Sequence, residues 1–332
     1  MPDTLPAPAP DATGQRPQRF VFVLLERFTL ISFAAAIEPL RLANRLSGRR
    51  LYDWRLCAEQ GTSATCSNGT RLALDGPLPE TGHGDTILVC GGIDVARAAT
   101  RPLLAWLRRE ARRGSRIGAL CTGAWVLAEA GLLDGRRAAI HWENHDGFSE
   151  RFPQVTLVRS VFTEDGNRLT AAGGTAAIDM MLHQIARSHG ADLAGRVAEQ
   201  LIHGAIRSGE DRQRNSVPER LGSRHPRLAQ VVARMEASIE DPVSPAELAA
   251  EAGMSPRQLE RLFARYLGCS PKRYYMEIRL ERARNLLAQT RMGVMEIALA
   301  CGFASSAHFS KCYRAAYGST PYRDRGLPAI TQ

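Results

Sequence analysis

Apolar residues in the last third of the chain recur at the spacing of short amphipathic helices, and the same arrangement occurs twice. In the first copy, Leu259, Leu262 and Phe263 repeat at intervals of three and four residues, which predicts a buried stripe along one helix. The segment that precedes this helix, residues 247–254, resembles residues 296–303 further along the chain. The sequence therefore predicts two related helical units in its C-terminal part.

Each unit is predicted to be a helix-turn-helix. Gly253 and Gly302 stand where the first helix ends, and glycine readily adopts the left-handed conformation that a tight turn needs. Ser255 and Ser305 are the expected N-caps of the second helices, with Pro256 in the first turn of one of them. A duplicated helix-turn-helix points to DNA, because such a unit places its second helix in a major groove.

The spacing of the two units fits duplex DNA. Residues 272–288 contain no glycine or proline and predict a connecting helix of about 17 residues, or about 25 Å. A spacer of this length can hold two recognition helices about 34 Å apart, which is one turn of the duplex. The polar side chains that face outward from these helices can reach base edges and phosphates. The residues predicted to contact DNA are Arg257, Gln258, Arg261, Arg265, Ser306, Ala307, His308, Lys311 and Arg314.

The first two thirds of the chain alternate between strand and helix patterns. Buried-strand runs at residues 20–25, 86–90 and 117–120 are separated by helical patterns at residues 33–46 and 102–113. This alternation predicts a doubly wound α/β domain of the flavodoxin-like kind, with a parallel sheet that binds ligands at the carboxyl ends of its strands. The expected fold is therefore an α/β domain followed by an all-α domain with two helix-turn-helix units.

Length and composition divide the chain into segments. A chain of 332 residues is too long for one domain of usual size. Residues 1–18 are rich in proline and alanine and are expected to form a disordered tail. The α/β domain is assigned to residues 19–206 and the DNA-binding domain to residues 225–326. Residues 207–224 are charged and nearly devoid of apolar side chains, which predicts a linker.

The charge of the chain agrees with a nucleic-acid partner. The formal net charge is +9, and residues 221–332 hold sixteen Lys and Arg against ten Asp and Glu. The basic excess thus lies mainly on the predicted DNA-binding part, where it would neutralise phosphates. Only two of the 43 basic residues are lysine, so part of the arginine content can reflect genome composition.

The cysteines and the apolar runs indicate where the protein works. The seven cysteines are scattered without a C-x-x-C pair, which argues against a disulfide framework and against a structural zinc site. No apolar run reaches the roughly 18 residues of a membrane span. We therefore expect a cytoplasmic protein that needs no metal, cofactor or membrane.

A cysteine stands at the junction of a predicted strand and helix. Residues 118–124 are small residues around Cys121, and they lead into a predicted helix at residues 125–133. Such a sequence is typical of the sharp strand-turn-helix corner that holds a nucleophile above a sheet, where helix amides can lower a thiol pKa. The corner is a candidate for either catalysis or ligand binding.

Several short stretches of the chain carry resemblances to known families. In the C-terminal part they are 283–287, 297–298, 302–303, 308–313 and 318–323, and through them residues 225–325 resemble the DNA-binding domain of the AraC/XylS family. In the N-terminal part they are 91–92, 118–124, 131–135, 141–142 and 171–179, and through them residues 20–205 resemble PfpI-type members of the class I glutamine amidotransferase-like superfamily. The pairing of the two is similar to GlxA-type transcriptional regulators.

The resemblance argues against catalysis at Cys121. Hydrolytic relatives place a histidine beside the cysteine or some twenty residues after it, and an acid after the first strand to orient that histidine. His141 stands in the later position, but residues 26–32 offer no acid at the right place. A thiol without an assembled base and orienting group is a weak nucleophile. We therefore expect a regulator rather than an enzyme, with a cysteine hydrolase or hydratase fused to a DNA-binding module as the alternative.

The same resemblance suggests the class of effector. Stretches at residues 36–44 and 140–144 look like those of regulators that activate catabolism of glycine betaine, dimethylglycine or carnitine, while arginine-responsive members share much of the pattern. A methylated ammonium is held best by an aromatic face with a carboxylate nearby. The candidate ligand-binding residues are Glu38, Cys121, His141, Trp142 and Glu143.

Trp142 and His141 each have a second interpretation, because either can equally be a buried core residue. The N-terminal domain can also serve only to dimerise the protein. With these alternatives open, the sequence predicts a transcriptional activator that binds a promoter in double-stranded DNA and responds to a small amine. RNA polymerase is the expected protein partner, and a second copy of the chain in a homodimer is a further candidate.

Overall fold

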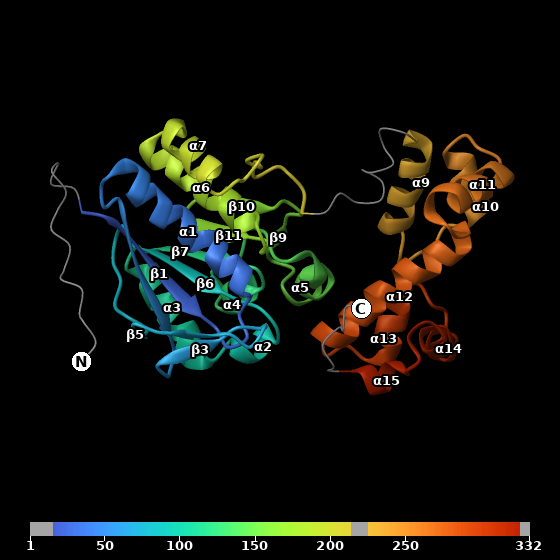
Figure 1. Cartoon of the computed structure of the whole chain (residues 1–332). Helices are drawn as coiled ribbons and strands as arrows, with labels where there is room; N and C mark the ends of the chain where they lie inside the picture. Colours follow the sequence, from blue (N-terminus) through green and yellow to red (C-terminus); the bar gives the residue numbers. More distant parts are fainter. Residues whose placement is uncertain (1–15, 214–224, 326–332) are drawn as a thin grey trace. The chain divides into compact units, whose positions relative to one another are not determined.

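A computed structural model describes residues 16–213 and 225–325, and these fall into two compact units. The first unit consists of residues 16–145 and 152–213, and the second of residues 146–151 and 225–325. The doubly wound α/β fold and the helical fold with two helix-turn-helix units, both predicted from the sequence, are confirmed (Figure 1).

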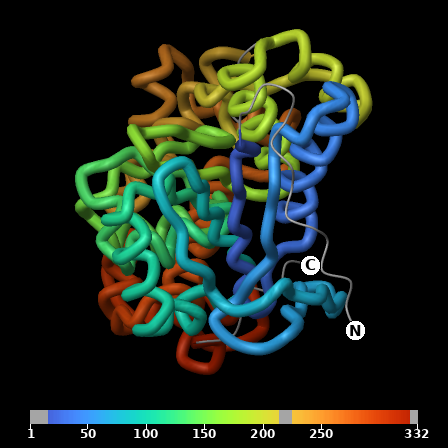
Figure 2. Tube along the Cα trace, turned by 90° about the vertical axis from the view of Figure 1, so that its left-hand side faces the viewer, coloured from blue at the N-terminus to red at the C-terminus, as the bar shows by residue number. Residues whose placement is uncertain are grey.

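The first unit is built on a seven-stranded sheet in the order β10-β11-β7-β6-β1-β2-β5. All neighbouring strands run parallel except the pair β10 and β11 at one edge. Figure 2 shows the blue segments of β1, α1 and β2 side by side. The strands are β1 (Gln18–Leu24), β2 (Tyr52–Ala58), β5 (Gly76–Pro77), β6 (Thr86–Cys90), β7 (Arg116–Leu120), β10 (Phe162–Asp165) and β11 (Arg168–Ala171).

Helices cover both faces of this sheet (Figure 1). Phe20, Phe22 and Leu24 of β1 pack into a core with α1, α6 and α7, and the alternate residues Val21 and Val23 are equally buried from the other side. This is why the strand reads as a continuous apolar run. The helices are α1 (Leu30–Ser47), α6 (Ala176–His189) and α7 (Ala191–Gln200) on one face, and α2 (Val95–Ala98), α3 (Arg101–Arg112) and α4 (Gly123–Glu129) on the other.

Short elements complete the N-terminal region. Two small strand pairs lie outside the main sheet, β3 with β4 and β8 with β9. These elements are β3 (Ser63–Thr65), β4 (Arg71–Ala73), β8 (Arg137–Ala138), β9 (Thr156–Leu157), the 3₁₀ helix η1 (Trp142–Asn144) and α5 (His145–Arg151).

The second unit contains seven helices among its residues 225–325. Two apolar cores lie along it, and the long helix α12 contributes to both, with Tyr275 in the first core and Leu280, Leu286 and Leu287 in the second. The helices are α9 (Pro226–Ala237), α10 (Pro245–Glu251), α11 (Pro256–Leu267), α12 (Pro271–Gln289), α13 (Val294–Ala300), α14 (Ser306–Tyr317) and α15 (Pro321–Asp324).

The expected caps begin the recognition helices. The Ser255 hydroxyl accepts a hydrogen bond from the backbone N–H of Gln258, whose side chain accepts one from the Ser255 N–H in return, so that α11 begins with a capping box. The Ser305 hydroxyl likewise accepts from the N–H of His308 at the start of α14. These bonds satisfy backbone donors that the first turn of a helix leaves open.

The loop between α9 and α10 packs against α12 and against the turn of the second helix-turn-helix. The Tyr275 hydroxyl of α12 donates to the Ser238 carbonyl at 2.7 Å. Gly302 lies in the turn of the second helix-turn-helix, has a φ of 72°, and packs against the same loop. A β-carbon at Gly302 would stand 2.5 Å from the Ile239 oxygen and from Pro242. The turn therefore needs glycine both for its conformation and for this close approach.

The segment predicted as a linker begins within the first unit. Residues 207–213 form hydrogen bonds with it, including a pairing of Val161 N–H with the Asp211 carbonyl at 2.7 Å. Residues 1–15 of the predicted tail and residues 214–224 lie outside the described residues, and β1 begins at Gln18.

A pair of glycine substitutions separates the two demands on these turns. Gly253→Ala should cost about 1–2 kcal/mol, because Gly253 has φ of 64° but open space around it. Gly302→Ala should cost a further 1–3 kcal/mol or so, because the backbone of the α9–α10 loop must move. Urea unfolding followed by circular dichroism measures both costs.

All four tryptophans lie in the first unit, so their fluorescence reports the unfolding of that unit. The urea concentration at the midpoint of this transition should be unchanged in both variants. Equal losses for the two alanines would contradict the role of the loop contact.

Candidate functional site

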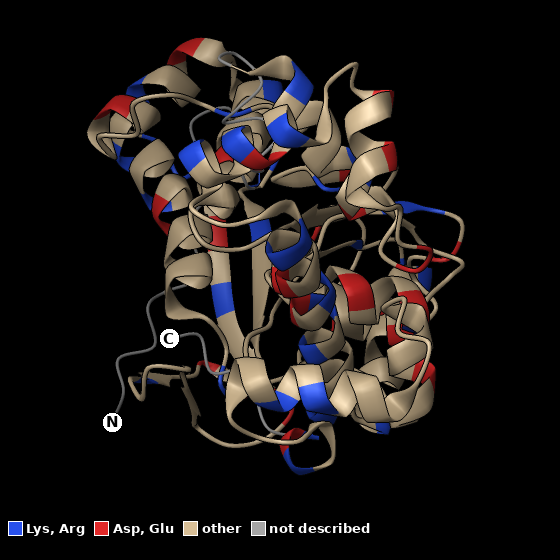
Figure 3. Cartoon of the chain, turned by 90° about the vertical axis from the view of Figure 1, so that its right-hand side faces the viewer, with Lys and Arg blue, Asp and Glu red and all other residues tan. Residues whose placement is uncertain are grey.

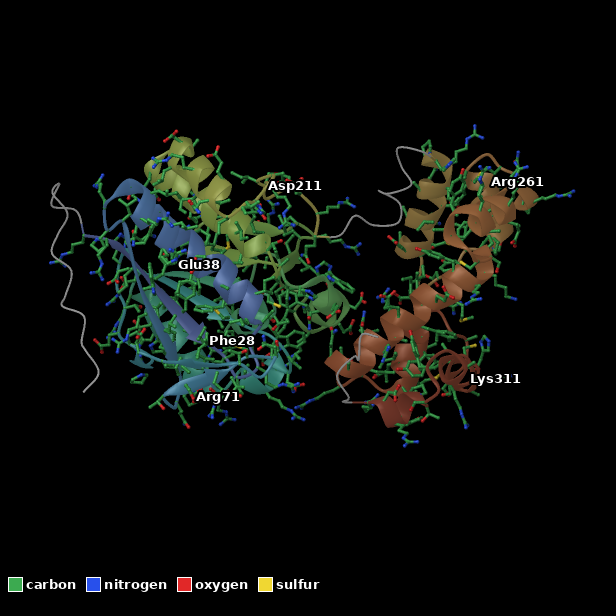
Figure 4. The ribbon with its side chains drawn as sticks, viewed as in Figure 1. Phe28, Glu38, Arg71, Asp211, Arg261 and Lys311 are labelled. Atoms are coloured by element: carbon green, nitrogen blue, oxygen red, sulfur yellow. The ribbon has the colours of Figure 1, made fainter. Side chains whose placement is uncertain are left out.

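The side chains predicted to contact DNA lie on the second helix of each helix-turn-helix. Leu259 and Phe263 bury one face of α11, and Phe309 and Tyr313 bury one face of α14. The opposite faces are exposed, and Figure 4 shows Arg261 and Lys311 on the side of α12 where both helices lie. The exposed residues are Arg257, Gln258, Arg261, Arg265, Ala307, His308, Lys311 and Arg314, while Ser306 is half-buried.

Three of these side chains have partners within the unit, and one of them is Arg265, whose guanidinium lies 5.4 Å from the centre of the Tyr266 ring. The Gln258 amide oxygen accepts the bond of the capping box at 2.8 Å, so its amide nitrogen takes no part in the cap. His308 Nε2 lies 3.4 Å from Cys312 Sγ, one helical turn further along α14. Figure 3 shows Lys and Arg spread over several helices with acidic residues between them.

A cavity of about 300 Å³ lies beside α11. Gln258 and Arg261 line it on one side, and Leu228 and Leu262 supply apolar surface. Because two predicted DNA contacts border the cavity, it belongs to the same surface of the domain as the recognition helix.

Arg279 has a structural role in the DNA-binding unit that the sequence alone did not reveal. From the middle of α12 its guanidinium donates to the carbonyls of Cys301 and Gly302 at 2.8 and 2.6 Å and lies over the Phe303 ring at 4.2 Å. Burial lowers its pKa from the usual arginine value. Arg279 thus holds the turn that precedes α14, and its side chain is half-buried.

Cys121 occupies a strained corner at the carboxyl end of β7. Its φ is 58°, an uncommon value for a residue other than glycine. Close backbone packing holds the corner: a β-carbon at Gly91 would collide with the backbone at Gly123, and one at Gly173 would lie 2.9 Å from the Cys121 β-carbon. The strand-turn-helix predicted from the sequence is present, although α4 ends at Glu129 instead of continuing to residue 133.

The surroundings of the Cys121 thiol do not activate it. Burial raises its pKa, the hydroxyls of Thr29 and Ser32 and the Thr122 backbone lower it less, and the charge of Glu143 raises it further. The Thr29 oxygen lies 3.7 Å from the sulfur. A thiol with a raised pKa is protonated at neutral pH, and only the thiolate is an effective nucleophile. These surroundings therefore favour Cys121 as part of the wall of a ligand pocket over Cys121 as a nucleophile.

Three of the remaining candidate ligand residues, His141, Trp142 and Glu143, lie together after β8, whereas Glu38 does not. The rings of His141 and Trp142 lie 5.5 Å apart, and His141 Nδ1 is 3.7 Å from a Glu143 carboxylate oxygen. All three side chains are half-buried or partly exposed, which differs from the fully buried core interpretation. Glu38 lies on α1 (Figure 4), where its carboxylate accepts two hydrogen bonds from Arg41.

The negative charge of Glu143 raises the pKa of Cys121, so Glu143 lies within electrostatic range of the corner. Together they offer an aromatic face, a carboxylate and a neutral thiol. Within residues 16–213 and 225–325, no three His, Cys, Asp or Glu side chains are grouped as a metal site. No helix in the described part of the chain is long and apolar enough to cross a membrane.

Comparison with known proteins extends over both units. A model of the DJ-1/PfpI family matches residues 22–187, and a model of a helix-turn-helix domain matches residues 248–326. The HTH-type transcriptional regulator GbdR of Pseudomonas aeruginosa is 46% identical over 96% of this chain and 87% of its own length. The HTH-type transcriptional regulator GlxA of Rhizobium meliloti is 40% identical over 94% of this chain and 97% of its own.

A solved structure adds a further likeness. The crystal structure of an AraC family transcriptional regulator from Pseudomonas putida is 34% identical and covers 56% of this chain and 100% of that one, with a TM-score of 0.52.

The raised pKa of Cys121 predicts how the thiol reacts. Alkylation of Cys121 by iodoacetamide should be slow at pH 7 and should keep rising with pH above 9, because the neutral thiol dominates below its raised pKa. Peptide mass spectrometry measures the rate, with the partly exposed Cys312 as the internal reference. A reaction rate that is already maximal between about pH 6 and pH 8 would show a thiolate and support catalysis.

Proposed function

Because the chain belongs to the family of HTH-type transcriptional regulators that join a DJ-1/PfpI domain to an AraC-type helix-turn-helix domain, we propose that it activates transcription in response to a small amine. The predicted identity as a DNA-binding regulator rather than an enzyme is confirmed by these relatives. The class of effector, the activating role and the residues of both sites are parts of the proposal.

The grouping of Trp142 with Glu143 carries the effector proposal. A methylated ammonium gains from the negative face of an aromatic ring and from a carboxylate, while it donates few or no hydrogen bonds. Trp142 offers the ring and Glu143 the charge, while the thiol of Cys121 is neutral and does not repel a carboxylate on the same ligand. A zwitterion such as glycine betaine or dimethylglycine combines these features.

Arginine is the second candidate effector. A guanidinium also stacks on an aromatic ring and pairs with a carboxylate, so the same cluster accommodates it. It differs from a quaternary amine because it donates several hydrogen bonds, which the hydroxyls of Thr29 and Ser32 near the corner can accept.

On the DNA side, α11 and α14 are proposed to enter successive major-groove faces of a promoter. α12 connects the two helix-turn-helix units, and its 19 residues correspond to a length of about 28 Å. We further propose that the protein works in the cytoplasm, contacts RNA polymerase at the promoter, and binds DNA as a homodimer or as a single copy with two recognition helices.

Loss of one lysine tests the placement of α14. Lys311→Ala should weaken specific DNA binding by about 1–3 kcal/mol if the lost contact is to a base, and it should lower the salt dependence if the contact is to a phosphate. The control is Arg273→Ala on α12, because the Arg273 guanidinium is 72% exposed and paired with Glu277. Gel-shift titrations at several salt concentrations measure both variants. If Lys311→Ala and Arg273→Ala had the same DNA affinity and the same salt dependence, the proposed placement of α14 in the major groove would be wrong.

Two substitutions at one ring test the effector site. Trp142→Ala should weaken binding of dimethylglycine or glycine betaine by on the order of 1–2 kcal/mol, the range for a cation over an aromatic ring, and Trp142→Phe should cost less. Calorimetry of the full chain measures the affinities, with arginine as a separate titrant. Heat with arginine alone would replace the amine proposal by the amino-acid one.

A further inference from the structure

The chain leaves the α/β unit through a segment that is hydrogen-bonded to two walls of the candidate effector site. This exit segment, residues 203–213, follows α7 and is the last described part before residue 225 (Asp211 marks it in Figure 4). It contains no helix or regular strand, so its position depends on individual hydrogen bonds. Its two ends are held at different places.

The first attachment is made by Asp179 on α6. Its fully buried carboxylate accepts hydrogen bonds from His203 Nε2 at 2.8 Å and from the backbone N–H and Nε of Arg207 at 2.8 and 2.9 Å. The Arg207 guanidinium also donates to the Thr175 hydroxyl at 2.9 Å. Thr175 directly follows the Gly173–Gly174 turn that lies against Cys121. Arg207 is therefore tied to the turn that forms one wall of the corner.

The second attachment combines a backbone pairing of residues 211–213 with residues 159–161 and the hydrogen bonds of the Gln213 side chain. The Gln213 amide nitrogen donates to the carbonyls of Ile140 and Ser160 at 2.9 and 3.0 Å. Ile140 immediately precedes the His141–Glu143 cluster. Because an amide nitrogen has two hydrogens and both go to carbonyls, the orientation of this amide is fixed by its partners.

His145 closes the same loop from its other end. His145 Nε2 lies 3.1 Å from the Ile140 carbonyl, which can only accept, so this nitrogen carries the hydrogen. Burial lowers the pKa of His145 to about 4, so the ring is neutral at pH 7. The Ile140 carbonyl thus accepts from both His145 and Gln213. A movement of residues 141–144 that turns this carbonyl must alter the bond to Gln213.

We propose that Gln213 and Arg207 are positioning residues that transmit effector binding to the chain segment leading to the DNA-binding domain. The inference rests on the proposed effector site. An effector that binds one arrangement of the His141–Glu143 loop more tightly than another shifts the population of the exit segment in the same sense, because the two share the Ile140 carbonyl. Neither residue touches the effector or DNA.

The test uses the full chain with Gln213→Glu, which keeps the shape of the side chain and removes both amide hydrogens. A carboxylate facing two carbonyls should break the side-chain bonds to Ile140 and Ser160 and leave the backbone pairing with residues 159–161 in place. Gln213→Leu repeats the test without added charge. The control is Gln184→Leu, because Gln184 is a buried amide of the same unit whose hydrogen bonds join Arg116 to Glu164 and do not involve the exit segment.

Amide hydrogen exchange gives the first readout. Peptides that cover residues 141–148 should exchange faster in both Gln213 variants and at the wild-type rate in Gln184→Leu. This measurement needs no effector, so it tests the attachment even if the proposed effector site is wrong. Unchanged exchange in both Gln213 variants would overturn the inference.

The second readout is the effect of dimethylglycine or glycine betaine on affinity for a duplex selected by the wild-type protein. Wild type should change its affinity by a factor on the order of 5–150, and the Gln213 variants should bind the effector in calorimetry yet show no change in DNA affinity. A wild-type response that persists undiminished in both variants would also overturn the inference. A wild type that binds neither compound refutes the proposed effector instead, and the exchange result then decides the inference.

Discussion

The backbone segments that meet at the carboxyl ends of β6 and β7 pack so closely that they exclude a β-carbon, and the α/β site is built on this packing. Gly91 and Gly123 touch through their backbones, and Gly173 lies against Cys121 from the third side. With these segments fixed, Thr29 and Ser32 at the start of α1 reach the thiol. Larger residues at these glycines would push the segments apart and disrupt the backbone of the corner, even where they touch no ligand.

A comparable constraint organises the DNA-binding unit, although there it is a helix rather than a junction of loops. Tyr275 and Leu280 of α12 belong to different apolar cores, and Arg279 between them binds the turn of the second helix-turn-helix. The loop between α9 and α10 makes contact with Tyr275 and Gly302 together. The spacing of the recognition helices is therefore set by one continuous helix and by contacts on both sides of its midpoint. A rigid spacing suits a ligand with a fixed helical repeat.

Sequence periodicity was sufficient wherever burial alone determines structure. The exposed faces of α11 and α14 follow directly from their apolar stripes, and the Cys121 corner follows from its small residues. Strand β2 was not predicted, although Tyr52, Trp54 and Leu56 alternate with Asp53 and Arg55 at the period of two that is typical of a half-buried strand. Arg279 and the exit segment lack such a signal. Their roles come from hydrogen bonds to distant partners, such as Gln213 to Ile140, and a polar residue gives no periodic signal of such a partner.

The corner keeps a conformation that enzymes use while lacking the chemistry that would exploit it. A residue other than glycine with positive φ costs on the order of 1–3 kcal/mol and persists only where the surroundings enforce it. At Cys121 the neighbours enforce the backbone and at the same time raise the thiol pKa, so that strain and reactivity are separated. The strain then has a structural consequence alone, because it holds Cys121 between the end of β7 and the first turn of α4, against the Gly173–Gly174 turn. A strained backbone with a neutral thiol therefore fits the proposed role of binding a molecule without transforming it.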